Sequence, residues 1–326
     1  MTRRGFVYGA YGAAALAFAG EPRSKMGIAT TSYIGGNPVR DAYEFLEHAN
    51  SLGAGGIQAS PLGDFAKVRD RAASLGMYVE AIISLPRNED AAAFEKTVQN
   101  AKAMGATCVR ANAGGRRYED FSTLADFEKF KARALTAIKI AVPIAEKYKM
   151  PLAIENHKDF TLVEQVALFK SYSSEYFGSC LDFGNNIALC EDPMEVAEKL
   201  APFAITTHVK DMAVEPYPDG FLLSEVRLGE GFLDLKKIIS QLRPNTHLNL
   251  EMITRDPLKI PCFTDRYWAT FPTVKADQLA RALRLVEQHK KKLPRVSQLP
   301  KDELLRIMEE NNIACLQYAR EKMPYL

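Results

Sequence analysis

Short apolar segments alternate with amphipathic segments through most of this 326-residue chain, and this alternation restricts its fold more than any other feature. The apolar segments are uninterrupted enough to be strands buried on both faces. We expect strands at 26–34, 56–60, 77–85, 107–111, 152–155, 178–182, 204–209 and 247–252. We expect helices at 38–52, 64–75, 89–104, 123–148, 162–171, 193–200, 235–242 and 275–289. Gly53, Gly76 and Gly105 follow three of these helices directly, as glycine often does where a helix ends before a strand.

Eight strand–helix units predict a parallel sheet that closes on itself. Neither the GxGxxG nor the GxxxxGK[ST] pattern of open nucleotide-binding sheets occurs in the chain. An apolar content of 47% is enough for one large core. We therefore predict an α/β fold with a single (β/α)8 TIM barrel over residues 26–292, closed by the helix at 275–289. We also predict an extra C-terminal helix in 293–326, which either packs on the barrel or mediates contact in a homo-oligomer.

The first twenty residues differ from the rest of the chain. Arg3 and Arg4 precede an uncharged segment rich in Ala and Gly, and 17–19 form a small-x-small cleavage site. We predict that residues 1–20 are a twin-arginine export signal and that the protein is periplasmic or exported; the alternative is an extension of a cytoplasmic protein. The apolar segment is too short for a membrane span. The five cysteines contain no CxxC pair, so we expect no zinc knuckle, and a Cys180–Cys190 bridge is only weakly indicated.

Four of the expected strands end on a side chain that can bind a metal ion. These residues are Glu155, Asp182, His208 and Glu251, separated by 27, 26 and 43 positions. Because the carboxyl ends of parallel barrel strands meet at one mouth, we expect the four side chains to converge there. Three carboxylates and one imidazole favour one divalent ion, with Mn²⁺ preferred, Mg²⁺ or Co²⁺ also suited and Zn²⁺ less favoured.

The segments around these residues resemble the xylose isomerase-like TIM-barrel superfamily of sugar isomerases and epimerases, which includes the sugar phosphate isomerase/epimerase family. The resemblance rests on the segments Ile154-Glu155-Asn156-His157, Leu181-Asp182-Phe183-Gly184-Asn185, Thr207-His208-Val209-Lys210-Asp211, Arg227-Leu228-Gly229-Glu230-Gly231 and Leu250-Glu251. It implies that Glu155 and Glu251 bind the metal and also move protons, while Asp182 and His208 complete the coordination. Ketose 3-epimerases of this kind usually carry a histidine where this chain has Asn185.

Six further residues are candidates for substrate binding. His157 and Lys210 lie two positions beyond Glu155 and His208, so strand alternation directs them to the same side. Their alternatives are a structural role for His157 and a surface ion pair with Asp211 for Lys210. The other four candidates are Glu80, Asn185, Arg227, whose alternative is a surface loop arginine, and Trp268. For Glu80 the alternative is a buried ion pair with Arg110, and for Trp268 it is aromatic packing within its loop.

These observations predict a divalent-metal-dependent sugar isomerase or epimerase that removes a proton α to a carbonyl and forms a metal-stabilised enediolate. The first alternative is a lyase or dehydratase acting on keto-sugars or 3-keto-glycosides. The second is a non-catalytic sugar-binding barrel. The sequence shows no cluster of Arg and Lys for a phosphate group, which favours a non-phosphorylated sugar. The net charge of +2 gives no indication of a nucleic acid or membrane partner.

Overall fold

The computed structural model describes residues 23–36, 41–273 and 276–323 of the chain. The export signal predicted at residues 1–20 lies outside the described residues. Within them, no helix is both long enough and apolar enough to cross a membrane.

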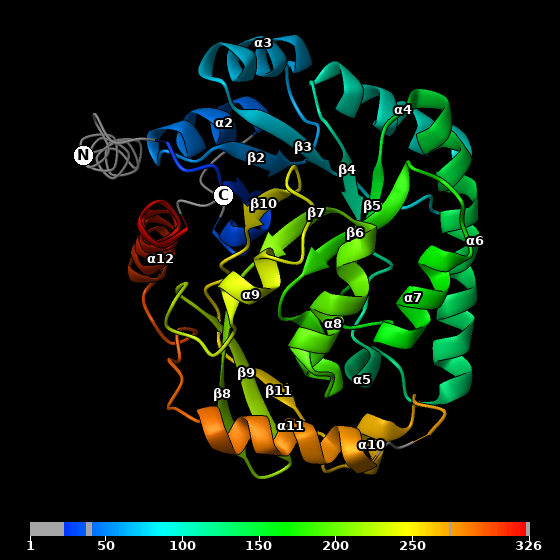
Figure 1. Ribbon diagram of the computed structural model, residues 1–326, viewed down its shortest axis with the longest axis vertical. Helices are drawn as coiled ribbons and strands as arrows, with labels where there is room; N and C mark the ends of the chain where they lie inside the picture. The colour runs from blue at the N-terminus through cyan, green and yellow to red at the C-terminus, as the bar shows by residue number, and fades with distance from the viewer. Residues whose placement is uncertain (1–22, 37–40, 274–275, 324–326) are drawn as a thin grey trace.

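Eight parallel strands form a closed barrel, which confirms the predicted fold class (Figure 1). The strands are β1 Gly27–Ala29, β2 Gly56–Ala59, β3 Tyr78–Ile82, β4 Val109–Ala111, β5 Leu152–Glu155, β6 Phe177–Asp182, β7 Ala204–Val209 and β10 His247–Leu250. Around the barrel they follow the order β1-β10-β7-β6-β5-β4-β3-β2. Asp182 of β6 pairs with His208 of β7, and His208 pairs with Asn249 of β10. This register places the ends of β6, β7 and β10 at the same level of the barrel.

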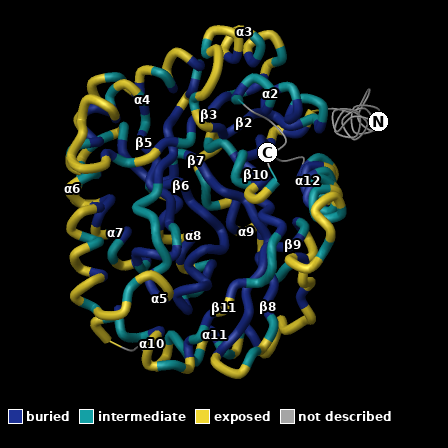
Figure 2. Tube along the Cα trace, turned by 180° about the vertical axis from the view of Figure 1, so that it is seen from behind, coloured by how far each residue is buried: buried dark blue, intermediate teal, exposed yellow. Residues whose placement is uncertain are grey.

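Helices surround the barrel, and most of them begin at a side-chain cap. The helices are α2 Ala42–Ser51, α3 Phe65–Leu75, α4 Ala91–Ala103, α5 Arg117–Asp120, α6 Leu124–Tyr148, α7 Leu162–Lys170, α8 Pro193–Leu200, α9 Leu235–Ile239, α10 Asp265–Trp268, α11 Ala276–His289 and α12 Lys301–Lys322. Helix α7 shows the local reason for its start, because Thr161 and Glu164 form a reciprocal capping box. The barrel strands form the buried centre of the tube in Figure 2, whereas the outer faces of the helices are exposed.

The segment after β7, in which we expected neither strand nor helix, is a β-hairpin. Strands β8 Asp211–Tyr217 and β9 Gly220–Val226 pair antiparallel, and β11 Leu258–Ile260 adds to β9. Only Pro218 and Asp219 separate β8 from β9. The Asp219-Gly220 pair is a recognised hairpin signal that could have revealed this turn. Because β8 starts directly after β7, this small sheet lies beyond the carboxyl ends of the barrel strands.

Helix α12, not α11, completes the helical shell beside β10. We expected the helix at 275–289 to close the barrel, but α11 packs against β8 of the small sheet. Helix α12 instead contacts β10 and the 3-10 helix η1 (Thr30–Tyr33), and Figure 1 shows α12 beside β10. It buries Met308, Cys315 and Leu316 there. The C-terminal segment that we separated from the barrel therefore supplies part of its outer layer.

All five cysteines are buried and unbonded, so the weakly indicated Cys180–Cys190 bridge is not formed.

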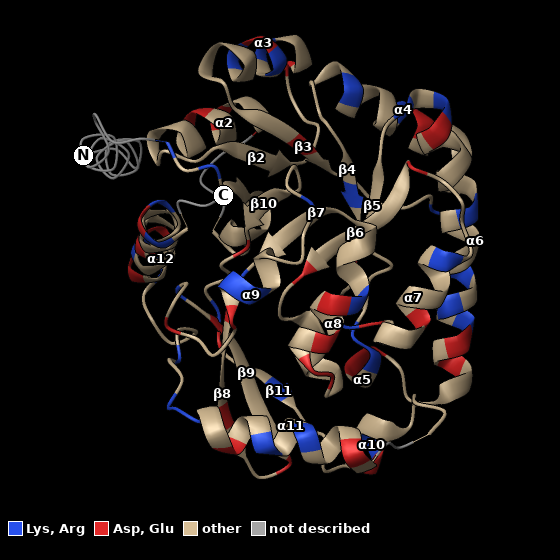
Figure 3. Cartoon of the chain, viewed as in Figure 1, with Lys and Arg blue, Asp and Glu red and all other residues tan. Residues whose placement is uncertain are grey.

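The buried apolar side chains make one large cluster across the barrel and its helices. Both basic and acidic side chains lie on the outer helices α6, α7 and α8 in the view of Figure 3.

Candidate metal centre

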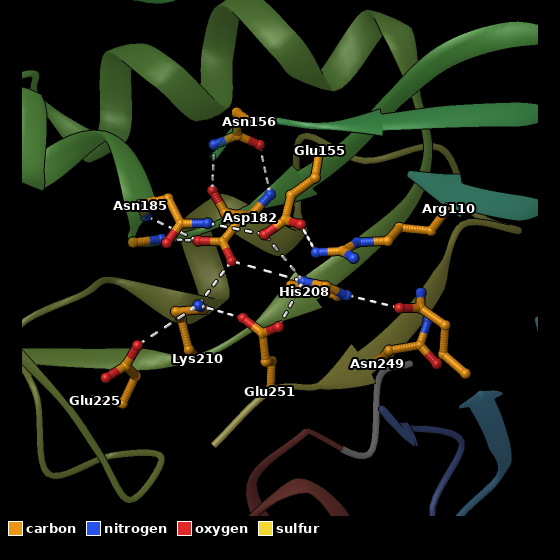
Figure 4. A network of polar contacts seen from close by, with 12 residues as sticks. Arg110, Glu155, Asn156, Asp182, Asn185, His208, Lys210, Glu225, Asn249 and Glu251 are labelled. Carbon is orange, nitrogen blue, oxygen red and sulfur yellow. Dashed lines mark hydrogen bonds and ion pairs between the residues drawn. The ribbon is translucent and has the colours of Figure 1, made fainter. Parts of the chain in front are cut away.

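Four side chains converge at the carboxyl end of the barrel, as the sequence predicted. Glu155 ends β5, Asp182 ends β6, His208 lies near the end of β7, and Glu251 directly follows β10. Each offers one ligand atom, and these atoms all lie within 4.8 Å of one another. All four residues are buried, with at most 3% of their surface exposed. Figure 4 shows the side chains pointing toward a common centre.

Backbone contacts fix the position of Asp182. Its Oδ1 accepts hydrogen bonds from the backbone N–H groups of Gly184 (2.9 Å) and Asn185 (2.8 Å). Asn156 bridges the ends of β5 and β6, since its side chain donates to the carbonyl of Asp182 and accepts from the N–H of the same residue. These contacts occupy one carboxylate oxygen of Asp182 and leave Oδ2 directed at the other candidate ligands.

Gln58 of β2 orients the ring of His208. Gln58 Oε1 lies 2.7 Å from His208 Nε2, and as an amide oxygen it can only accept, so Nε2 carries the hydrogen. Nδ1 then faces the carboxylates, at 3.2 Å from Glu251 and 3.4 Å from Glu155. Burial alone would lower the pKa of His208, but the neighbouring Cys180 and Glu251 raise it to about 9. The centre therefore favours positive charge at the position of Nδ1.

Two cationic side chains also contact the carboxylates. Lys210 Nζ lies 2.8 Å from Asp182 Oδ2 and 2.5 Å from Glu251 Oε2, and Arg110 Nη2 pairs with Glu155 Oε2. Burial would raise the pKa of Glu251, but His208, Lys210 and Arg110 hold it well below its usual range. Lys210 is 1% exposed, so the alternative of a surface ion pair with Asp211 was wrong.

The donor set fits a divalent cation. In the described part of the chain, His208 Nδ1 is buried without a hydrogen-bond partner, and Glu155 Oε2 and Asp182 Oδ2 are paired only with the cationic groups of Arg110 and Lys210. Buried polar atoms are normally satisfied, so an unpartnered imidazole nitrogen among carboxylate oxygens that attract cations favours a bound cation. Carboxylate oxygens with one imidazole nitrogen suit Mn²⁺, Mg²⁺ or Co²⁺, and a bound ion would receive all these lone pairs.

Besides Lys210, two of the predicted substrate contacts lie beside this centre. Asn185 Nδ2 donates to Glu155 Oε1 (2.9 Å), and Asn185 Oδ1 accepts from Lys158 Nζ. His157 Nδ1 lies 2.9 Å from the carbonyl oxygen of Gly115. Burial, followed by Lys158 and Arg110, lowers the pKa of His157 well below its usual value. His157 is therefore a neutral imidazole next to the centre.

The structure places the other three predicted contacts elsewhere. Glu80 lies deeper in the barrel and accepts hydrogen bonds from Gln58, Thr206 and Asn249. It therefore neither lines the mouth of the barrel nor forms an ion pair with Arg110. Arg227 donates to Asn311 of α12. Trp268 donates to the carbonyl of Cys262 and packs on Tyr267 and Phe271, which is the aromatic loop packing that was its alternative.

A comparison with known families matches residues 46–269 to the family described as xylose isomerase-like TIM barrel. This match spans more than half of the chain. The chain belongs to this family. The resemblance that its sequence motifs indicated is thereby confirmed.

The relatives of this xylose isomerase-like barrel include enzymes of more than one class. The chain is 32% identical over 114 residues to a 3-oxo-isoapionate decarboxylase of Pectobacterium atrosepticum, which covers 34% of the chain and 42% of that enzyme. The chain spans about half the length of the curated relatives it matches, namely 42% of the decarboxylase and 52% of a second relative.

Solved structures share the fold at low sequence identity. A D-psicose 3-epimerase with D-tagatose from Clostridium cellulolyticum H10 superimposes with a TM-score of 0.57 at 11% identity, over 82% of this chain and 99% of that one. An IOLI protein with a bound zinc atom gives a TM-score of 0.55 at 15% identity, over 80% and 96%.

Sequence reasoning missed several charged residues around the centre of this family member. Glu225 of β9 lies 3.9 Å from Lys210 and pairs with Arg255 at 2.7 Å. Lys158, in the loop after β5, is 4% exposed. Burial and the nearby Lys210 and Arg255 lower the pKa of Lys158 to about 8. These residues are scattered in the sequence, so no local pattern indicated them.

Proposed function

We propose that this protein is a divalent-metal-dependent isomerase or epimerase of a non-phosphorylated sugar or sugar derivative. Glu155, Asp182, His208 and Glu251 would hold the ion, with Mn²⁺ as the first choice. When bound, such an ion stabilises the negative charge that develops on oxygen as a proton leaves the carbon α to a carbonyl. The observation that carries this proposal is the gathering of four buried ligand-type side chains within 4.8 Å.

In this proposal the two glutamates transfer the proton. They flank His208, with their nearest oxygens at 3.4 Å and 3.2 Å from its Nδ1. One glutamate accepts the α-proton and the other delivers a proton, either to the opposite face of the same carbon or to the neighbouring carbon. Lys210 supports this role of Glu251, because its ammonium group keeps the carboxylate ionised and fixed in position.

A second candidate function is a lyase that acts on a keto acid, and the similarity to the decarboxylase favours it. In a 3-oxo acid the bond to the carboxyl carbon breaks, CO₂ leaves, and the electron pair remains as an enolate. A glutamic acid at the centre then protonates the enolate carbon. The same charge stabilisation serves both reactions, so the geometry of the centre is compatible with either.

One assay tests both candidates. Purified protein is stripped with a chelator and reloaded with Mn²⁺, then incubated in D₂O with free sugars, sugar acids and 3-keto-glycosides. Deuterium in recovered substrate or an isomeric product supports the isomerase, whereas CO₂ or another leaving group supports the lyase. Absence of both reactions in protein that binds Mn²⁺ would favour the non-catalytic sugar-binding barrel.

We also propose that the chain is exported, as its N-terminal residues predict. Expression of the full chain with a C-terminal tag, followed by fractionation, tests this. Replacement of Arg3 and Arg4 by Lys should retain the protein in the cytoplasm if the twin-arginine route is used.

A further inference from the structure

Four cationic side chains are connected to the metal centre, and three of them have a carboxylate partner. Lys210 pairs with Asp182 and Glu251, Arg110 with Glu155, and Arg255 with Glu225. Lys158 is the fourth. Among the described residues, no carboxylate lies within ion-pair distance of its Nζ, which contacts only the amide oxygen of Asn185. A buried ammonium group without a counterion is costly, so its place beside the centre needs an explanation.

The backbone holds Lys158 firmly at this place. Its carbonyl oxygen accepts a hydrogen bond from Arg117 N–H (2.8 Å), and its backbone forms a bridge with Arg116. One amide side chain separates its Nζ from the metal centre, because Asn185 donates to Glu155 Oε1 with its nitrogen while accepting from Lys158 with its oxygen. A molecule bound at the four-residue centre would therefore lie within reach of the Lys158 ammonium group.

The charges connected to the centre also favour an anion. The carboxylates of Glu155, Asp182, Glu225 and Glu251 balance the four cationic side chains. A divalent cation would leave the site with two uncompensated positive charges. A substrate with one carboxylate would reduce this excess and supply the missing partner of Lys158, whereas a neutral sugar would do neither.

We propose that Lys158 binds a carboxylate of the substrate, so that the substrate class is a sugar-derived acid rather than a neutral sugar. This inference rests on the proposed function for the position of the substrate, and it applies to the isomerase and the lyase alike. It narrows the substrate to a polyhydroxylated carbonyl compound that carries a carboxylate beyond the metal-binding oxygens.

The test compares two probes, erythronate and its neutral counterpart erythritol, by calorimetric titration of metal-free and Mn²⁺-loaded protein. We expect wild-type protein to bind erythronate more tightly and Lys158→Met to weaken erythronate binding by about 10- to 100-fold, without a change for erythritol. Lys139→Met removes an exposed lysine from α6 and is the control for charge alone. Equal erythronate affinity in wild-type and Lys158→Met protein would overturn the inference.

Thermal unfolding provides an independent measurement. Removal of an unpaired buried charge should raise the melting temperature of Lys158→Met in the absence of ligand, whereas loss of a structural lysine would lower it. Erythronate should raise the melting temperature of the wild type more than that of the variant.

These results also separate the inference from the proposed function. One outcome is that the wild-type protein prefers erythronate without binding Mn²⁺, and that Lys158→Met abolishes this preference. In that case the anion site stands and the metal enzyme does not. If Mn²⁺ binds and erythronate affinity does not depend on Lys158, the metal centre stands and the anion site is refuted.

Discussion

The interior of the barrel contains two buried polar clusters, and they differ in how well their polar atoms are satisfied. The upper cluster is the metal centre at the carboxyl ends of the strands, formed by Glu155, Asp182, His208 and Glu251. The lower cluster surrounds Glu80 and consists of Gln58, Glu80, Thr206, His247 and Asn249. Glu80 Oε2 accepts from Gln58 (3.0 Å), Thr206 (2.7 Å) and Asn249 (2.9 Å), and Oε1 lies 2.9 Å from His247 Nδ1.

The comparison shows how a structural cluster differs from a binding cluster within one barrel. Every carboxylate oxygen of the lower cluster has a donor, and none of its side-chain atoms is among the buried unsatisfied ones. In the upper cluster, His208 Nδ1 has no hydrogen-bond partner, and Glu155 Oε2 and Asp182 Oδ2 have only ion pairs with Arg110 and Lys210. A complete hydrogen-bond network makes the lower cluster rigid, whereas the upper cluster, with an unpartnered nitrogen among its carboxylates, is suited to a bound cation. Gln58 joins the two clusters, since its amide contacts both Glu80 and His208.

The largest expected effect comes from the upper cluster. Glu155→Gln and Glu251→Gln should each lower turnover by about 10²–10⁴-fold, because a neutral amide cannot accept the proton. Turnover is measured as deuterium incorporation, and metal content is measured separately on the same samples. If either variant keeps full metal and full turnover, the assignment of that glutamate is wrong.

The lower cluster should respond through stability instead. Glu80→Leu leaves the donors of Gln58, Thr206 and Asn249 without an acceptor, so we expect the free energy of unfolding to fall by about 3 kcal/mol or more. Glu80→Gln keeps one acceptor oxygen and is the matched control, with an expected loss of about 1 kcal/mol. Denaturant unfolding of metal-free protein measures both. Unchanged stability of Glu80→Leu would remove the distinction between the two clusters.

The upper cluster could be predicted from the sequence because each of its members lies at or next to the end of a strand. Strand ends are set by local apolar runs, and the barrel then brings them together whatever the intervening loops do. The lower cluster was not foreseen, since Glu80 was assigned to the mouth of the barrel. Its depth depends on the register between neighbouring strands, such as Gln58 opposite Glu80, and one sequence contains little information on register.

The residues around the mouth were harder to predict for a different reason. Lys158, Glu225 and Arg255 lie on three separate segments, and the ion pair of Glu225 with Arg255 exists only after the hairpin β8–β9 has folded over the barrel. The exchange of roles between α11 and α12 has a similar origin. Both helices are amphipathic, and tertiary packing rather than local pattern decides which surface each one covers.

Replacement of Gln58 tests whether the two clusters act separately, because Gln58 belongs to the lower cluster and contacts His208 of the upper one. Gln58→Met removes the acceptor that fixes the ring of His208, so Mn²⁺ affinity should fall by roughly 10- to 100-fold. Equilibrium dialysis measures this affinity without reference to turnover. Thr206→Val is the control within the lower cluster, because the Thr206 hydroxyl donates to Glu80 and accepts from Asn249 instead of contacting His208. Similar losses of affinity in both variants would mean that the clusters act as one unit.

The smallest expected effect is a pH dependence that only the upper cluster can produce. Mn²⁺ needs the neutral imidazole of His208, whose pKa is raised to about 9 in the metal-free protein, so binding must release a proton below that pH. The affinity for Mn²⁺ should therefore rise by about tenfold per pH unit through neutral pH and level off near pH 9.

The raised pKa of His208 also affects the stability of the metal-free protein. The protonated histidine stabilises the fold fully below the unfolded pKa of 6.5, and this contribution disappears as the pH rises through about 9. The stabilisation by Mn²⁺ should thus increase over the pH range in which the protonated histidine ceases to stabilise the fold. Calorimetric titration in buffers of different ionisation enthalpy counts the released protons, and a count of zero at pH 7 would show that His208 is already neutral in the metal-free protein.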